Sequence, residues 1–171
     1  SSDLPVVLMN SDSSVFNISF PAQNRTINSS ELFFQSPGVV KNGSIQSISL
    51  RLNAGNNKYI EYIYSIDNES YLVNFKVNVN GLKDIISPNA TYLAVDWRDF
   101  ITKKEHSVKN ERAATTIYYR FTDEDVDYIN PASDKQLSLK TKVKWIAFKQ
   151  QFFISVLIAD AALESPSVET H

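Results

Sequence analysis

The stretch Tyr71-Leu72-Val73-Asn74-Phe75-Lys76-Val77-Asn78-Val79 alternates apolar and polar side chains with a period of two. In an extended chain this alternation places the odd-numbered apolar side chains on one face and their polar neighbours on the other. The preceding run, Ile60 to Ile66, alternates in the same way, and the turn-forming residues Asp67-Asn68-Glu69-Ser70 separate the two runs. The two runs therefore predict a β-hairpin with one buried face and one face in water.

The same alternation recurs on both sides of this hairpin. It is present at residues 48–52, 93–98, 117–121 and 137–147, and each segment predicts a half-buried strand. In the last of these, Lys140, Lys142 and Lys144 occupy alternate positions, which predicts that they form one wet face of a sheet. The alternative is that they form a contact for acidic partners or lipid head groups.

A continuous apolar run, Phe152 to Ala159, follows the last alternating segment. A run without alternation is typical of a central strand that is covered on both faces. It is far shorter than the roughly 20 residues that a helix needs to cross a bilayer, so we expect core and not a membrane span. No basic segment followed by an apolar one opens the sequence, so we expect any targeting signal or anchor to lie outside this chain.

The absence of helical periodicity indicates the fold class. Apolar residues do not recur at helical spacing over three turns, and the polar segment from Ile101 to Thr115 is predicted to be a solvated loop or flap. Strands separated by turn clusters predict an all-β fold, in which antiparallel sheets pack as a β-sandwich. The 171 residues are expected to form a single domain with weakly ordered ends at about 1–14 and 163–171.

Composition argues against several classes of function. The chain has 17 Lys and Arg against 19 Asp and Glu, so it lacks the excess positive charge that nucleic-acid binding requires. It has no cysteine, which excludes thiol nucleophiles, thiolate metal sites and disulfides. Only four glycines are present, and none forms a dinucleotide-binding or Walker motif. We therefore predict no cofactor and no nucleic-acid partner.

The two histidines offer little basis for catalysis. His106 lies in the charged segment and His171 ends the chain, and no Gly-x-Ser-x-Gly elbow accompanies them. Hydrolysis by a Ser/His/Asp triad is therefore not predicted, and the role of His106 stays open. A carboxylate pair for glycoside hydrolysis also stays open, because the separation of the two groups in space decides that activity.

Three alternate acidic residues, Asp123, Asp125 and Asp127, resemble the first half of a calcium loop. Such a loop needs glycine at its sixth position and a bidentate glutamate at its twelfth, where this chain has Tyr128 and Asp134. A solvated acidic turn is the better interpretation. The sequence therefore predicts no catalytic, cofactor-binding or metal-binding residues, and it does not indicate which residues bind a partner.

Three segments resemble a known family. The first, Trp145-Ile146-Ala147-Phe148-Lys149-Gln150-Gln151-Phe152-Phe153 with Val156 to Ala159, resembles the signature strand region of the large periplasmic domain of YidC membrane protein insertases. Tyr71 to Val77 resembles an earlier strand of that domain. The segment Ile117 to Phe121, with Asp125 to Asp127, resembles the Bacteroidetes version of the part between them. Order and spacing agree with the family over about residues 60–159.

The resemblance implies a β-supersandwich related to galactose mutarotases. It also implies a position on the periplasmic side of the bacterial inner membrane, with attachment through segments absent from this chain. The implied role is that of a non-catalytic scaffold or docking module, which assists the insertion and folding of inner-membrane proteins. Its partners would be accessory subunits of the Sec translocon and nascent membrane polypeptides, bound at a sheet edge or in an aromatic-lined groove. The histidine and glutamate residues of mutarotases have no matching motif here.

Two alternatives remain at this point. One is a carbohydrate-binding or carbohydrate-active β-sandwich, in which exposed stacked aromatic rings would lie beside paired carboxylates in one cleft. The other is a structural domain that only spaces other parts of the protein.

Overall fold

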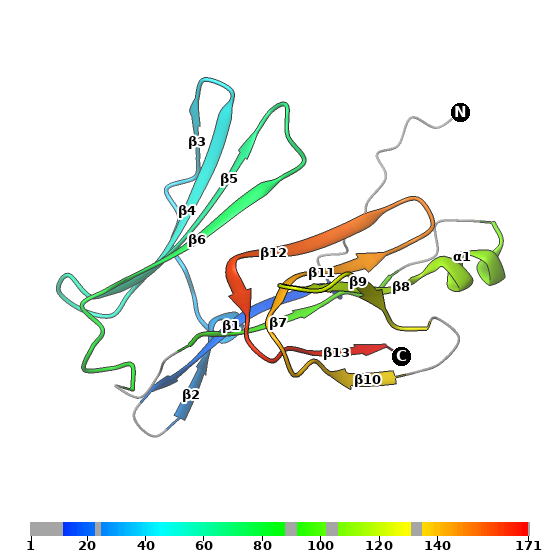
Figure 1. Ribbon diagram of the computed structural model, residues 1–171. Helices are drawn as coiled ribbons and strands as arrows, with labels where there is room; N and C mark the ends of the chain where they lie inside the picture. Colours follow the sequence, from blue (N-terminus) through cyan, green and yellow to red (C-terminus); the bar gives the residue numbers. More distant parts are fainter. Residues whose placement is uncertain (1–11, 23–24, 88–91, 102–105, 131–134, 171) are drawn as a thin grey trace. The chain divides into compact units, whose positions relative to one another are not determined.

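The computed structural model describes residues 12–22, 25–87, 92–101, 106–130 and 135–170 (Figure 1). Within these ranges the chain is mostly β-strand, and the strands of every sheet pair antiparallel. The all-β fold class predicted from the sequence is confirmed. The chain divides into two compact units, Ser11–Asp99 and Phe100–His171, here called the amino-terminal and carboxyl-terminal units.

The amino-terminal unit contains two sheets. The first has the order β2 (Arg25–Asn28), β1 (Val15–Ala22), β7 (Ala94–Arg98), and the second has the order β3 (Val39–Asn42), β4 (Ile45–Asn53), β5 (Tyr59–Asp67), β6 (Val73–Asn80). A short 3-10 helix, η1 (Ser29–Glu31), follows β2. The predicted hairpin is confirmed as β5 and β6, in which Tyr62 lies opposite Val77 and Tyr64 opposite Phe75.

The two sheets of this unit share one hydrophobic core. Ile18 and Phe20 of β1 pack with Ile60 and Tyr62 of β5 and with Leu82. Because these residues come from both sheets, the sheets pack with their apolar faces together, as in a sandwich. Alternation along β5 and β6 produces this face, since every second residue points into the core.

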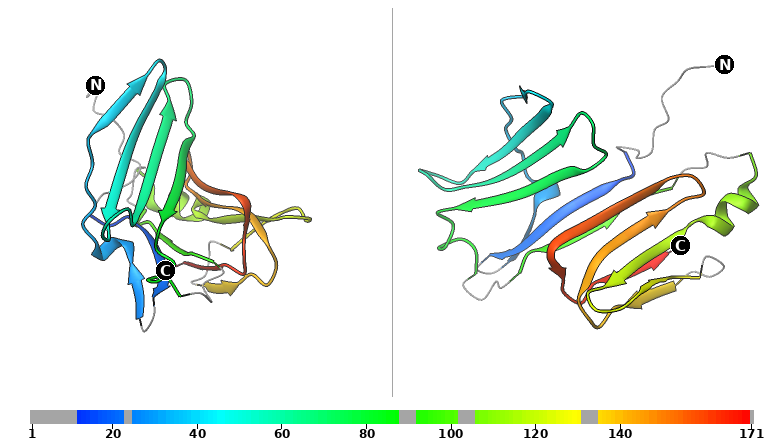
Figure 2. Two further views of the ribbon diagram at one scale, coloured as in Figure 1. Left: turned by 90° about the vertical axis from the view of Figure 1, so that its left-hand side faces the viewer. Right: turned by 45° about the horizontal axis from the view of Figure 1, so that its top comes forward.

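The carboxyl-terminal unit contains a four-stranded sheet and a two-stranded ribbon (Figure 2). The sheet has the order β12 (Ile154–Leu163), β11 (Val143–Lys149), β8 (Thr116–Phe121), β9 (Val126–Tyr128), and the ribbon pairs β10 (Lys135–Ser138) with β13 (Ser167–Thr170). Ile117 and Tyr119 of β8, Ile146 of β11 and Val168 of β13 belong to one buried cluster. The ribbon therefore covers one face of the sheet.

The structure corrects the strand predicted at 137–147. The chain leaves β10 after Ser138 and enters β11 at Val143, so the segment belongs to two sheets. Leu139 and Val143 are both buried in the same cluster, and the chain must turn between them to reach it from two sides. Lys140 and Lys142 lie in this connection, where Lys142 pairs with Glu164 at 2.8 Å, so the three lysines do not form one sheet face.

The run at 152–159 was predicted to be a central strand, and this prediction is wrong. It forms most of β12, which lies at the edge of its sheet with one apolar row exposed. An apolar run reports only that both faces are apolar, and it does not report the position of the strand in the sheet.

The prediction of a loop across 101–115 is also corrected, because this segment contains a short helix. Helix α1 spans Val108–Ala114, and the side chain of Ser107 accepts a hydrogen bond from the Asn110 backbone at its start. Seven residues are too few to show a helical period in the sequence. No helix in the described part of the chain is long and apolar enough to cross a membrane.

The two chain ends differ. Residues 1–11 of the end expected to be weakly ordered lie outside the described residues. At the other end, Ser167–Thr170 forms β13, with Val168 buried against β8 and β11. A single buried side chain and pairing with β10 hold this polar segment, and neither feature is visible in its composition.

Candidate interaction surfaces

In the described part of the chain, the acidic and histidine side chains do not gather into a metal-binding group. Among the described residues, no group of three or more His, Cys, Asp or Glu side chains could hold a metal ion. His106 is exposed immediately before the start of α1, and His171 lies outside the described residues. Asp127 accepts hydrogen bonds from the Tyr119 hydroxyl at 3.1 Å and the Tyr128 backbone N–H at 2.8 Å. Through the bond to Tyr119, Asp127 links β9 to β8.

One carboxylate on the outer face of β4, β5 and β6 accepts three hydrogen bonds from side chains. Glu61 accepts hydrogen bonds from Ser49 at 2.7 Å, Arg51 at 3.0 Å and Asn78 at 3.2 Å. The hydrogen bond from Ser49, followed by those from Asn78 and Arg51, lowers the pKa of Glu61 below its ordinary value of 4.5. A carboxylate held ionised by three donors is unsuited to act as a general acid, so this cluster is structural.

Strand β12 has a free edge. It is the terminal strand of its sheet and pairs only with β11 in the part of the chain that the structure describes. A two-residue hairpin joins them, in which the Gln150 N–H donates to the Phe153 carbonyl at 2.8 Å. Hydrogen-bonded and non-hydrogen-bonded pairs alternate along an antiparallel ladder. The backbone groups of Ile154, Val156 and Ile158 therefore point away from β11, toward the free edge.

The same three residues extend an apolar surface over the outer face of the sheet. In register, Ile158 lies opposite Trp145, and Val156 lies opposite Ala147. Ala147 in turn lies opposite Tyr118 of β8. The outer apolar face, as we call it, also includes β9. Its members are Tyr118, Val126, Tyr128, Trp145, Ile154, Val156 and Ile158.

Much of this outer apolar face is accessible. Ile154, Val156, Ile158 and Tyr128 are 56%, 44%, 52% and 54% exposed. Exposed apolar side chains that are contiguous on one sheet are typical of interaction sites. This surface was not predicted from the sequence, because an apolar run is normally buried on both faces.

The stacked pair Tyr118 and Tyr128, with ring centroids 5.3 Å apart, resembles part of a carbohydrate platform. The adjacent acidic residue, Asp127, has its carboxylate on Tyr119, a residue of the core face. The stacked rings and Asp127 therefore do not form the combination expected of a sugar site.

Comparison with known proteins identifies the family. The sequence model of the family described as the YidC periplasmic domain matches residues 1–171 of this chain. This chain belongs to the YidC periplasmic domain family. The segments that resemble the family lie in β11 and β12, in β6, and in β8 and β9.

Relatives of this family member are named membrane protein insertase YidC. The chain is 31% identical to the protein of Azobacteroides pseudotrichonymphae, over 97% of this chain and 27% of that protein. It is 29% identical to the protein of Phocaeicola vulgatus and 28% identical to that of Parabacteroides distasonis, covering 96% and 98% of this chain and 26% of each relative. The chain therefore spans about a quarter of the length of these relatives. No solved structure matches it, so the relation to galactose mutarotases stays a prediction.

Proposed function

We propose that this YidC periplasmic domain is a non-catalytic docking module of a membrane protein insertase. The observation that supports this is the family match across all 171 residues. The module lies on the periplasmic side of the inner membrane and assists the insertion and folding of membrane proteins. Because the chain spans about a quarter of its relatives' length, insertion itself is not proposed for its residues.

The proposed mechanism is strand addition at β12. Outward N–H and C=O groups at Ile154, Val156 and Ile158 supply hydrogen bonds to an extended segment, and the outer apolar face contacts alternate side chains of that segment. The proposed partners are nascent membrane polypeptides and accessory subunits of the Sec translocon. Nascent membrane segments are rich in apolar side chains, which complement this face.

A proline substitution tests the mechanism. In Val156→Pro the missing N–H is one that points to the free edge, so the ladder to β11 keeps its hydrogen bonds while the edge loses a donor. We expect the variant of the intact insertase to lose capture of Sec accessory subunits and of unfolded membrane polypeptide in pull-down assays. Val156→Thr keeps the N–H and is the matched control, for which capture persists.

The fold of each variant is checked by circular dichroism. Capture by a folded Val156→Pro protein at the level of the wild type would exclude strand addition at β12. Absence of capture of either partner by the wild-type protein would remove the docking function itself.

A further inference from the structure

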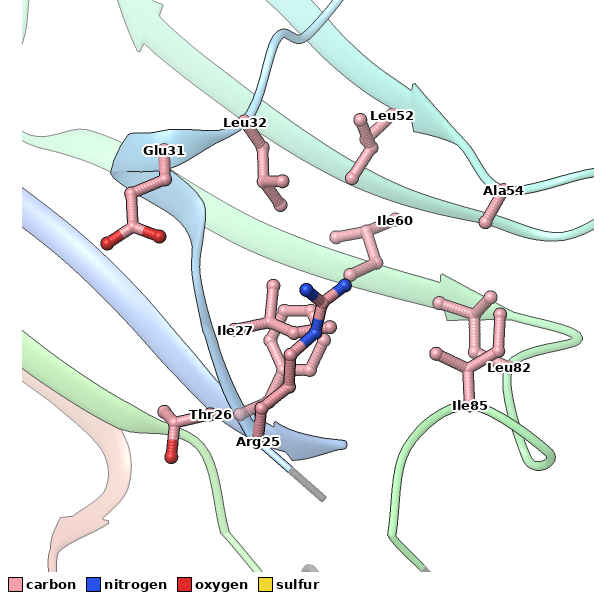
Figure 3. A pocket seen from close by; sticks show the side chains of 11 residues that line it. Arg25, Thr26, Ile27, Glu31, Leu32, Leu52, Ala54, Ile60, Leu82 and Ile85 are labelled. Atoms are coloured by element: carbon pink, nitrogen blue, oxygen red, sulfur yellow. The ribbon is translucent and has the colours of Figure 1, made fainter. Parts of the chain in front are cut away.

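The amino-terminal unit has an open pocket of about 400 Å³ where its two sheets diverge (Figure 3). Its lining is graded by depth. Phe20, Ile60 and Leu82 are buried at the base, and the aliphatic side chains of the walls are half-buried. Those wall residues are Ile27, Leu32, Leu52 and Ile85.

The rim is polar and includes one cation. Arg25 of β2 is exposed, and Figure 3 shows its side chain reaching over Ile27 toward Ile60. Among the described residues Arg25 forms no ion pair with a carboxylate. Glu31 is also on the rim, but its carboxylate is turned away from Arg25 and accepts a hydrogen bond from Asn28 at 2.9 Å. Arg25 is therefore available to a ligand.

This combination points to an amphiphilic anion. A planar guanidinium binds a carboxylate through two parallel hydrogen bonds. The base and walls consist of hydrocarbon side chains, which suit an aliphatic tail. The volume is near the lower end of the range for small-molecule pockets, which is about 300–1,000 Å³. The ligand is therefore short.

We propose that this pocket binds a medium-chain fatty acid, with its carboxylate on Arg25 and its tail against Ile60 and Leu82. The polar residues of the lining are Arg25, Thr26 and Glu31, all on the rim. A peptide carboxyl terminus would bring amide groups into the aliphatic part, where they would lose hydrogen bonds to water. A fatty acid has no such groups. This site is separate from β12 and does not depend on the proposed docking function.

Isothermal titration calorimetry of the full chain with decanoate tests the proposal. We expect saturable binding of one decanoate, and affinity at least about tenfold lower for decanol, which has the tail without the charge. Arg25→Gln is expected to cause a similar loss, while Arg98→Gln, which removes a cation from β7, leaves the affinity unchanged. Ala54→Leu narrows the rim and is expected to weaken binding. Ile158→Ser, on the outer apolar face, is expected to leave decanoate binding unchanged.

Two results would overturn the proposal. The first is the absence of saturable decanoate binding, or equal affinity in wild type and Arg25→Gln. The second is tighter binding of trileucine than of decanoate, which would assign the pocket to peptide carboxyl termini. Neither result tests capture at β12, because the Val156→Pro experiment measures capture of Sec accessory subunits and unfolded membrane polypeptide and not binding of decanoate.

Discussion

Glu61 shows how one side chain can make stability depend on pH. Its lowered pKa means that the ionised form is favoured in the folded state, so its stabilising contribution is complete above 4.5 and is lost as the pH falls through the lowered pKa. We expect Glu61→Gln to reduce the free energy of unfolding by about 1–2 kcal/mol at pH 7. Urea denaturation should show the difference from wild type shrinking below pH 4.5. Glu69→Gln, at an exposed turn, is the control, and a difference that stays constant with pH would contradict the assignment.

Tyr62 presents the opposite case, a buried polar atom without a partner. Its side chain stacks on Phe34, and its hydroxyl has no hydrogen-bond partner within the described residues. The neighbouring Ser29 hydroxyl donates its one proton to Asn17 and accepts from the Ile18 N–H, so it has no proton to donate to Tyr62. We expect Tyr62→Phe to raise the free energy of unfolding by about 1 kcal/mol, because it removes this unsatisfied group. Tyr64→Phe should change it little, and destabilisation by Tyr62→Phe would show that the hydroxyl is bonded in solution.

At the scale of elements, alternation of apolar and polar residues predicted a strand correctly where the strand and its partner are close in the sequence. Residues 60–79 form the predicted hairpin because a two-residue period and a polar turn are both short-range features of the sequence. Residues 137–147 kept an unbroken alternation, yet they divide between β10 and β11. The division depends on Val168, from a distant part of the chain, which packs in the same core as Leu139. No local pattern contains that contact.

The ribbon of β10 and β13 should therefore be essential to its unit. Val168 is 5% exposed, and Val168→Asp would bury an unpaired charge beneath the ribbon. We expect the free energy of unfolding to fall by about 3 kcal/mol or more. Fluorescence of Trp145, measured during urea denaturation in a Trp97→Phe background, reports the unfolding of this unit. Ser138→Asp adds the same charge at an exposed position of the partner strand, and an equal loss in both variants would rule out the packing role of Val168.

At the scale of the whole molecule, the resemblance of three segments indicated the family correctly, but it did not indicate the interaction surfaces. The segment 145–153, which carries the resemblance, lies in β11 and the hairpin that follows it. It is one continuous stretch, so the sequence alone shows it. The outer apolar face combines residues from four strands. Its existence follows from strand order, and a single sequence does not specify which strand lies at the edge. The pocket at Arg25 also depends on strand order, because residues from several strands line it.

The exposed β12 edge also predicts how the isolated chain behaves in solution. A long edge strand with outward backbone groups and an apolar row is a template for pairing between copies, and native proteins often block such edges with lysine. We expect the wild-type chain to self-associate with rising concentration in analytical ultracentrifugation, and Ile158→Lys to lower this association at least severalfold. Asn74→Lys, exposed on β6, changes the net charge from -2 to -1 in the same way and is the matched control. Equal suppression by both variants would attribute association to charge alone, whereas suppression by Ile158→Lys only would locate it at β12.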